Sequence, residues 1–306
     1  MTYDLIIIGG GPAGTAAGVY ASRKQLNTLL VTKEWGGQST VSPDIQNWIG
    51  TPSISGPDLA KSLRGHLETY AKDIVTIISD KHVKRVAKTD DNYTVELENG
   101  ETHTATAILV TSGSTRRRLN IPNADTFEHK GVTYCASCDG PIFAGQDVAV
   151  IGGGNAGFET AAQLLAYARS VTLLHRGDSY KADPVTVEKV LAHPNMKGIL
   201  NAVPTGVTGE KFVNGLTYET NGEIHTLPIT GIFVEIGMIP NTDLVADEVE
   251  RDAYNRIVID PWTQKTSAKN IWAAGDCTNV KYHQNNISAG DAVKALEDIY
   301  VSLKAH

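Results

Sequence analysis

The sequence of 306 residues predicts an α/β fold with two Rossmann-like dinucleotide-binding domains. Two observations support this prediction. A glycine-rich turn lies between a strand pattern and a helical pattern near the start of the chain, and the same arrangement occurs again in the middle of the chain. The length suits two domains better than one, and a hydrophobic content of 41% is sufficient for ordinary globular cores.

The first arrangement opens with an apolar run at residues 4–8, which predicts a strand. The turn at residues 9–14 has the spacing G-x-G-x-x-G, and a helical pattern at 16–20 and a strand at 28–32 follow it. In such a turn the first glycine permits the tight bend, the second permits close approach of a pyrophosphate, and the third permits the helix and strand to pack. The helix N-terminus adds unpaired N–H groups, so these residues predict a phosphate-binding turn.

The second arrangement has a strand at 148–151, the turn at 152–157, a helix at 159–168 and a strand at 171–174. One glycine-rich turn alone is weak evidence, because such turns are common. Here each turn follows a predicted strand and precedes a predicted helix and strand. This context makes each motif more specific evidence for a dinucleotide site. We therefore expect two dinucleotide sites in one chain.

The ends of the second strands predict which nucleotide each domain binds. Glu34 lies about 20 residues after the first turn, where a carboxylate hydrogen-bonds the ribose of an FAD or NAD site. We take His175 as the equivalent residue of the second arrangement, and Arg176 beside it can pair with a 2′-phosphate. The first domain is therefore assigned to FAD and the second to NADPH. The alternative for Glu34 or Arg176 alone is a solvated loop charge.

Cys135 and Cys138 form a C-x-x-C motif that Asp139 follows directly. This spacing lets two sulfurs reach bonding distance when the second cysteine lies in the first turn of a helix, where thiol pKa values are often low. The carboxyl group of Asp139 can transfer a proton to or from the leaving thiolate. Zinc would need a second ligand pair, but Cys277 is isolated and the nine histidines show no metal spacing, so we expect no metal. The other alternative is a pair of inert buried thiols. Residues 140–141 (Gly-Pro) argue against it, because they favour a surface turn beside the cysteines.

The composition excludes several classes of protein. A net charge of −7 at pH 7 argues against a nucleic-acid or membrane-surface role, because phosphate binding needs a basic face. No apolar run approaches the roughly 20 residues of a membrane span. We expect no signal peptide and a cytoplasmic location, because the first residues lead straight into a strand and three cysteines make no disulfide framework.

The remaining segments are predicted from alternation and turn residues. The run of three arginines at 116–118 is expected to be solvated. Together with residues 121–122 it predicts a linker between the domains, and residues 236–241 predict a second crossing between them. The other expected elements are strands at 94–97, 108–110, 207–213, 216–220, 223–227 and 271–273, and a helix at 288–303.

The segments Cys-Ala-Ser-Cys-Asp-Gly at 135–140 and Val-Ala-Val-Ile-Gly-Gly-Gly-Asn at 148–155 resemble the low-molecular-weight thioredoxin reductases. They are also similar to the reductase portion of the alkyl hydroperoxide reductase flavoprotein. The resemblance covers essentially the whole chain and implies an FAD domain at 1–114 and 240–306. An NAD(P)H domain at 115–239 would be inserted in it, each domain with three ββα layers, and hinges would lie near 113–118 and 237–242.

The resemblance also implies the residues of each site. The FAD site would comprise Gly9, Gly11, Pro12, Ala13, Gly14, Glu34, Gly37, Gln38, Asn47, Val83, Thr111, Gly113, Gly275, Asp276 and Gln284. The NAD(P)H site would comprise Gly152, Gly154, Asn155, Ala156, Gly157, His175, Arg176 and Lys181.

The implied activity is electron transfer from NADPH through FAD to the disulfide of Cys135 and Cys138, the latter nearest the flavin, and on to a thioredoxin or glutaredoxin-like protein. A homodimer is expected. The sequence departs from the family where a second arginine is replaced by Gly177, which leaves NADH possible as donor. It departs again at Asn285 and Asn286, which replace apolar residues beside the flavin. Alternatives are a ferredoxin-fed reductase, a dithiol oxidase and a non-enzymatic nucleotide-bound sensor.

Overall fold

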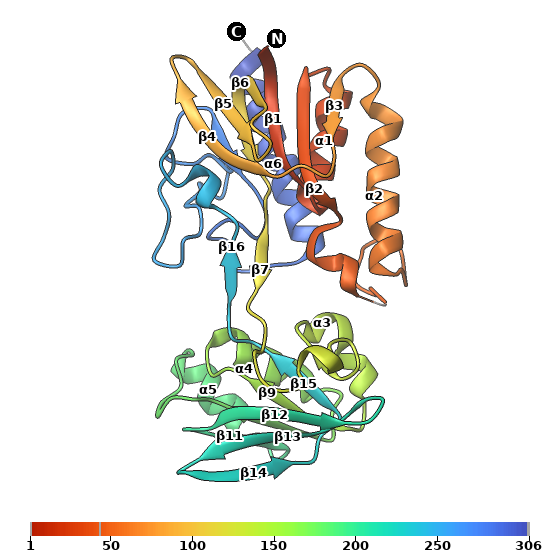
Figure 1. Cartoon of the computed structure of the whole chain (residues 1–306), viewed down its shortest axis with the longest axis vertical. Coiled ribbons are helices and arrows are strands. Elements are labelled where there is room, and N and C mark those ends of the chain that lie inside the picture. Colours follow the sequence, from red (N-terminus) through yellow and green to blue (C-terminus); the bar gives the residue numbers. More distant parts are fainter. Residues whose placement is uncertain (1, 43, 305–306) are drawn as a thin grey trace. The chain divides into compact units, whose positions relative to one another are not determined.

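The computed structural model describes residues 2–42 and 44–304. The chain forms two compact units (Figure 1). Unit 1 comprises Met1–Thr115 and Ile239–His306, and unit 2, Arg116–Met238, interrupts it. Within the described residues, no helix has the length and apolar character that crossing a membrane requires.

The sheet of unit 1 has the strand order β3-β2-β1-β6-β5-β4, and β17 also pairs with β6. Its parallel part has β1 at its centre, and the side chains of residues 5–8 are buried, as expected for a strand covered on both faces. The antiparallel strands β4 and β5 extend one edge. The strands are β1 (Thr2–Gly10), β2 (Thr28–Trp35), β3 (Val75–Ile78), β4 (Val83–Thr89), β5 (Asn92–Leu97), β6 (Thr102–Val110) and β17 (Ile271–Ala273).

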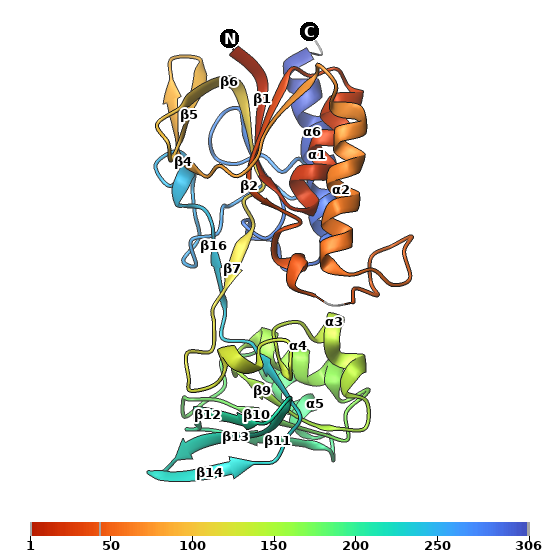
Figure 2. The ribbon, with the colours of Figure 1, turned by 45° about the vertical axis from the view of Figure 1, so that its right-hand side comes forward.

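Three helices pack on one face of this sheet: α1 (Pro12–Arg23), α2 (Gly56–Ala71) and α6 (Asn285–Lys304) (Figure 2). Small residues such as Ala17 and Ala295 are fully buried in the shared core, which lets α1 and α6 approach closely. On the opposite face, side chains of β1, β2 and β6 form a second core with those of β4, β5 and residues 244–280. The short helices η1 (Gly37–Val41) and η4 (Asp243–Val245) complete the unit.

The main sheet of unit 2 is parallel, with the order β11-β10-β9-β15-β8. Helix α4 packs on one face through Phe158 and Leu164, and the antiparallel sheet β12-β13-β14 packs on the other through Leu216. The unit therefore has the three ββα layers that the sequence predicts. Its strands are β8 (Val132–Thr133), β9 (Asp147–Ile151), β10 (Ser170–Leu174), β11 (Met196–Ile199), β12 (Val203–Gly209), β13 (Val213–Thr220), β14 (Glu223–Leu227) and β15 (Gly231–Val234). Its helices are α3 (Ala136–Asp139), η2 (Asp125–Phe127), η3 (Gly140–Phe143), α4 (Asn155–Leu164) and α5 (Pro184–Leu191).

The two chain crossings form β7 (Ser114–Arg116) and β16 (Met238–Pro240), which pair as a two-stranded sheet. Arg116 departs from the prediction of a solvated arginine run. Its side chain is half buried, and its guanidinium donates a hydrogen bond to the carbonyl oxygen of Tyr134. Arg117 and Arg118 are exposed as expected.

Several predicted boundaries are wrong; for example, β6 begins at Thr102 rather than at 108, and α4 ends at Leu164 rather than at 168. The predicted strand 207–213 contains a turn at 210–212, because β12 pairs back onto β13 with Gly209 opposite Val213. Helix α4 begins at Asn155 rather than at 159, because Gly154 of the glycine-rich turn is its N-cap. Helix α6 begins at Asn285 rather than at 288.

Candidate functional site

The glycine-rich turn of unit 1 links β1 to α1. Gly9 has φ of +119°, and a Cβ there would collide with the carbonyl group of Thr111. A Cβ on Gly14 would collide with the carbonyl oxygen of Gly9. Both glycines are therefore required by packing. Gly11 differs, because a Cβ there would meet nothing closer than the backbone of Gly37 at 3.9 Å.

The turn of unit 2 repeats this geometry residue by residue. Gly152 has φ of +128° and packs against the carbonyl group of Glu235, and Gly157 packs against the carbonyl oxygen of Gly152. A Cβ on Gly154 would have no atom within 4 Å. The middle glycine thus faces open space in unit 2 and makes only an ordinary contact with Gly37 in unit 1, beside a helix N-terminus where a pyrophosphate needs backbone without Cβ.

The strand register corrects one equivalence drawn from the sequence. Ile8 pairs with Val31, and Ile151 pairs with Leu174. Val31 and Leu174 are therefore equivalent positions in the two units. Counting on from them, His175 is the counterpart of Thr32, and Gly177 is the counterpart of Glu34. A Cβ on Gly10 would meet Thr32, and one on Gly153 would meet His175, which agrees with this register.

The other residues predicted for unit 1 lie at the carboxyl ends of its strands. Glu34 is exposed near the end of β2. Gln38 Nε2 donates to Ser114 Oγ at 3.1 Å and to Asp276 Oδ2 at 3.5 Å. Ser288 Oγ donates to Asp276 Oδ1 at 3.2 Å, so the structure brings Gln38, Asp276 and the start of α6 together.

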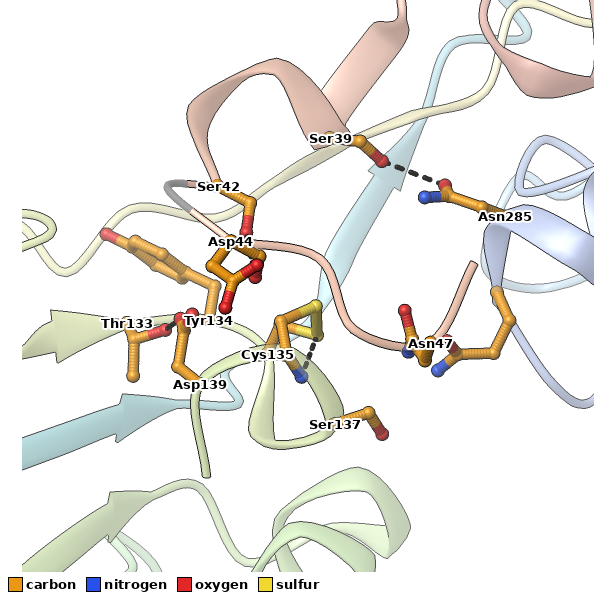
Figure 3. Close-up of a disulfide and its surroundings, with 12 residues drawn as sticks. Ser39, Ser42, Asp44, Asn47, Thr133, Tyr134, Cys135, Ser137, Asp139 and Asn285 are labelled. Atoms are coloured by element: carbon orange, nitrogen blue, oxygen red, sulfur yellow. Dashed lines mark hydrogen bonds between the residues drawn. A yellow bond between two sulfur atoms is a disulfide. The ribbon is translucent and has the colours of Figure 1, made fainter. Parts of the chain in front are cut away.

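Hydrogen bonds link residues 39 and 47 to the start of α6 and the residue before it. Ser39 Oγ donates to Asn285 Oδ1 at 2.8 Å (Figure 3), and Asn286 Nδ2 donates to the carbonyl oxygen of Asn47 at 2.7 Å. Asn47 Nδ2 donates to Gln284 Oε1 at 3.1 Å. The two asparagines that depart from the family pattern therefore cross-link two segments of unit 1.

Four further residues expected at the FAD site offer no free polar side chain. The side chain of Val83 is 3% exposed and belongs to the hydrophobic core of the unit. Thr111 Oγ1 donates to the carbonyl oxygen of Ile8 at 2.9 Å. Gly113 and Gly275 have φ of +65° and +80°, the region that favours glycine.

The predicted nucleotide residues of unit 2 surround its turn. Gly153 N–H donates to His175 Nδ1 at 3.2 Å, and burial lowers the pKa of this histidine, so its imidazole is a neutral acceptor. Arg176 and Lys181 are exposed, and Lys181 N–H donates to the carbonyl oxygen of Gly153 at 2.8 Å. Asn155 Oδ1 accepts from the N–H of Asp183 at 2.8 Å. Ala156 is exposed beside Asn155 in the first turn of α4.

Cys135 and Cys138 form a disulfide, with their Cα atoms 5.3 Å apart (Figure 3). Cys135 is the N-cap of α3, and Cys138 N–H donates to its Sγ at 3.2 Å. Both cysteines are half exposed. A sulfur at a helix N-cap accepts from backbone N–H groups, an arrangement that stabilises a thiolate after reduction.

Asp139 follows the disulfide and accepts a hydrogen bond from the hydroxyl of Thr133 through Oδ2 (Figure 3). Its Oδ1 is buried and has no hydrogen-bond partner among the described residues. Burial raises the pKa of Asp139, while Thr133, His129 and Arg116 oppose the shift. A carboxyl group with a raised pKa keeps its proton to a higher pH and can release it to a neighbouring thiolate.

Sequence reasoning missed four polar residues near these sites: Ser114, Thr133, Thr160 and Glu235. Each meets its partner through strand pairing or helix packing rather than through a motif, so no local pattern marks it. By contrast, Cys277 is fully buried, and burial raises the pKa of its thiol to about 11, as for a small residue of the hydrophobic core. Within residues 2–42 and 44–304, no group of three or more acidic, histidine or cysteine side chains is arranged to hold a metal ion.

Comparison with known proteins gives a consistent result. The family model described as pyridine nucleotide-disulphide oxidoreductase matches residues 3–292. The chain is similar to the alkyl hydroperoxide reductase F subunit (Escherichia coli K12), with 40% identity over 96% of this chain and 57% of the relative. It is also similar to a protein named NADH dehydrogenase of Bacillus subtilis 168, with 39% identity over 96% of this chain and 57% of the relative. The chain thus spans little more than half the length of these curated relatives.

Solved structures match over their full length. The thioredoxin reductase of Streptococcus pyogenes MGAS5005 superimposes with a TM-score of 0.89 and 31% identity, covering 100% of this chain and 99% of that chain. The thioredoxin reductase of Giardia duodenalis gives a TM-score of 0.92 and 28% identity, with the same coverage.

Proposed function

The chain belongs to the pyridine nucleotide-disulphide oxidoreductase family, and we propose that it is an FAD-dependent reductase of protein disulfides. Electrons would pass from NAD(P)H through FAD in unit 1 to the disulfide of Cys135 and Cys138. A thioredoxin or glutaredoxin-like protein would receive them. The likeness to thioredoxin reductases further favours a cytoplasmic homodimer.

The observation that supports this proposal most strongly is the half-exposed disulfide with Asp139 directly after it. Reduction of the disulfide consumes two electrons and two protons and yields two thiols. Asp139, whose pKa is raised by burial and which directly follows Cys138 in α3, would supply one of these protons. A structural disulfide would need no such acid.

The two glycine-rich turns fit the proposed nucleotides. Gly11 and Gly154 leave the helix N-termini open on the side where a pyrophosphate would lie. Glu34 would receive the adenosine ribose of FAD, and Gln38 and Asp276 would hold its ribityl chain. When bound, the flavin supplies reversible two-electron chemistry that protein side chains lack.

Transfer to the partner follows ordinary thiol–disulfide exchange. One thiolate of the reduced pair attacks the partner disulfide and forms a mixed disulfide, and the partner's other sulfur leaves as a thiol. The second cysteine then attacks the mixed disulfide. This step re-forms the bond between Cys135 and Cys138 and releases the reduced partner.

The choice of NADPH over NADH rests on one side chain. Arg176 is exposed at the end of β10, where it can pair with a 2′-phosphate, and Gly177 offers no second guanidinium. Arg176 favours NADPH as donor, with NADH as the second candidate.

The deciding experiment is an anaerobic titration of the FAD-loaded protein with NADPH and then with NADH. Thioredoxins and glutaredoxin-like proteins of the same organism are then added to the reduced protein. Rapid flavin bleaching and reduction of a partner disulfide support the proposal. Bleaching by neither nucleotide contradicts it and favours a ferredoxin-fed reductase, and bleaching without turnover of any disulfide favours a nucleotide-bound sensor. Formation of disulfides at the expense of oxygen would identify a dithiol oxidase.

A further inference from the structure

Glu235 lies at the point of unit 2 where a dinucleotide is expected to cross the sheet. It directly follows β15, and its N–H donates to the carbonyl oxygen of Ile151 at 2.8 Å, which continues the pairing of β15 with β9. The strand order reverses here, with β10 and β11 on one side of β9 and β15 on the other. In such sheets the ligand binds outside the carboxyl ends of the strands at this reversal.

The carboxyl group of Glu235 is held against α4. Thr160 Oγ1 donates to Glu235 Oε1 at 2.8 Å, and the Thr160 side chain is buried. The charged groups that act on Glu235 are Glu159, which is exposed on α4, and Arg116 in β7. Burial raises the pKa of Glu235 to about 7, Thr160 and Arg116 oppose this shift, and Glu159 adds to it. The carboxyl group thus changes charge in the neutral range.

Unit 1 places a neutral group at the same position. Thr111 directly follows β6, as Glu235 directly follows β15. The carbonyl group of each residue lies against the first glycine of the turn in its unit. The hydroxyl of Thr111 donates to the carbonyl oxygen of Ile8 and carries no charge. A titratable group at this position is therefore particular to unit 2 and is not required for closing the turn.

The direction of the dinucleotide decides what Glu235 faces. The adenosine end is expected at the end of β10, beside His175 and Arg176, because a 2′-phosphate needs that guanidinium. The nicotinamide end then lies toward β15, on the side of Glu235. This step rests on the proposed function, since it requires a nicotinamide dinucleotide in the second turn.

We propose that Glu235 sets the preference of unit 2 between oxidised and reduced nicotinamide dinucleotide. The oxidised ring has one positive charge that the reduced ring lacks. An ionised carboxylate on the nicotinamide side of the crevice favours the cationic ring, whereas the protonated acid does not discriminate by charge. Repulsion of the pyrophosphate by the carboxylate affects both forms equally and cancels in their ratio.

The sign of the pH dependence follows from linkage. Glu235 ionises as the pH rises through about 7, so the affinity for the oxidised form rises relative to the reduced form. If the cationic ring lowers the pKa of Glu235 by about one unit, the ratio of the two affinities changes about tenfold across this range.

The test compares two ligands by calorimetry on the FAD-loaded protein. One is the oxidised dinucleotide, and the other is its 1,4,5,6-tetrahydro analogue, whose ring is neutral and donates no hydride. Both are measured in the NADP and NAD series between about pH 5.5 and about pH 8.5, below and above the pKa of the carboxyl group. We expect the affinity ratio to change about tenfold in the wild type and to stay constant in Glu235→Gln.

Glu159→Gln is the matched control, because it removes the neighbouring exposed carboxylate and leaves Glu235 in place. Its ratio should still change with pH, with the midpoint shifted to lower pH because Glu159 no longer raises the pKa. Thermal unfolding shows whether each variant is folded. A ratio that does not vary with pH in the wild type, or one that varies equally in Glu235→Gln, overturns the inference alone. Failure of all four ligands to bind overturns the proposed function together with it.

Discussion

The hydroxyl of Thr133 donates a hydrogen bond to Oδ2 of Asp139, whereas Oδ1 of the same carboxyl group is buried without a partner among the described residues. Burial favours the protonated acid, and the bond from Thr133 favours the carboxylate. The proton affinity of Asp139 is therefore raised by burial and lowered by Thr133, His129 and Arg116, and the contribution of Thr133 can be removed separately.

The first prediction concerns this carboxyl group. Asp139→Asn should slow reduction of a protein disulfide about 100-fold, because the amide cannot donate the proton. In the wild type, the rate should fall as the pH rises through the pKa of Asp139, since the acid is the donor. Thr133→Val should move this fall to higher pH, because the hydrogen bond that favours the carboxylate is lost.

The measurement is the rate of partner reduction at a series of pH values for each variant. Asp125→Asn is the control, because it removes an exposed acid of the same unit. An unchanged pH profile in Thr133→Val would show that another group supplies the proton.

The second prediction separates the disulfide from the buried thiol. Cys135→Ser and Cys138→Ser should each abolish reduction of protein disulfides while FAD stays bound and is still bleached by the nucleotide. Cys277→Ala should keep the activity, because this thiol is fully buried and unpaired. Flavin absorbance and partner turnover measure both effects. Turnover retained in either serine variant would contradict the proposed function.

The third prediction uses the different surroundings of two glycines in the second turn. Gly154→Ala should fold normally and bind nicotinamide nucleotide at least tenfold more weakly, because its Cβ points into open space where the pyrophosphate would lie. Gly157→Ala should lower the free energy of unfolding by about 1–3 kcal/mol, because its Cβ would collide with the carbonyl oxygen of Gly152. Calorimetric binding and denaturant unfolding distinguish the two outcomes, and normal binding by Gly154→Ala would remove the phosphate role of this turn.

The fourth prediction tests the electron donor. Arg176→Ala should raise the Kd of NADPH about tenfold, because one charge-assisted hydrogen bond to the 2′-phosphate is lost, and should leave the Kd of NADH nearly unchanged. Arg118→Ala, which removes another exposed arginine of unit 2, is the control. An equal rise in the Kd of both nucleotides would mean that Arg176 attracts them only by its positive charge and does not recognise the 2′-phosphate.

The sequence predicted the parts of this structure that local patterns encode. The spacing of Gly9, Gly11 and Gly14 reports a turn whose constraints are local, and the disulfide motif lies within one short helix. The family resemblance also correctly indicated the three layers of unit 2.

The features that could not be predicted from the sequence depend on pairing between distant segments of the chain. Glu235 reaches the second turn only because β15 pairs with β9, two strands far apart in the chain. Arg116 was expected in solvent, yet its guanidinium donates a hydrogen bond to the carbonyl oxygen of Tyr134, a contact that no local pattern marks. The equivalence of His175 with Glu34 is wrong: Glu34 lies 20 residues after Gly14, and the residue 20 positions after Gly157 is Gly177, in agreement with the strand register.

Because Cys277 is fully buried, the number of reactive thiols in the native protein reports the oxidation state of Cys135 and Cys138. Alkylating reagents react with exposed thiolates, and this thiol is both inaccessible and neutral in the native protein. Native labelling followed by intact-mass measurement therefore adds two adducts to the reduced protein and none to the oxidised protein. The third adduct is added only after unfolding, so a single mass spectrum reports the redox state of the pair and the integrity of the fold.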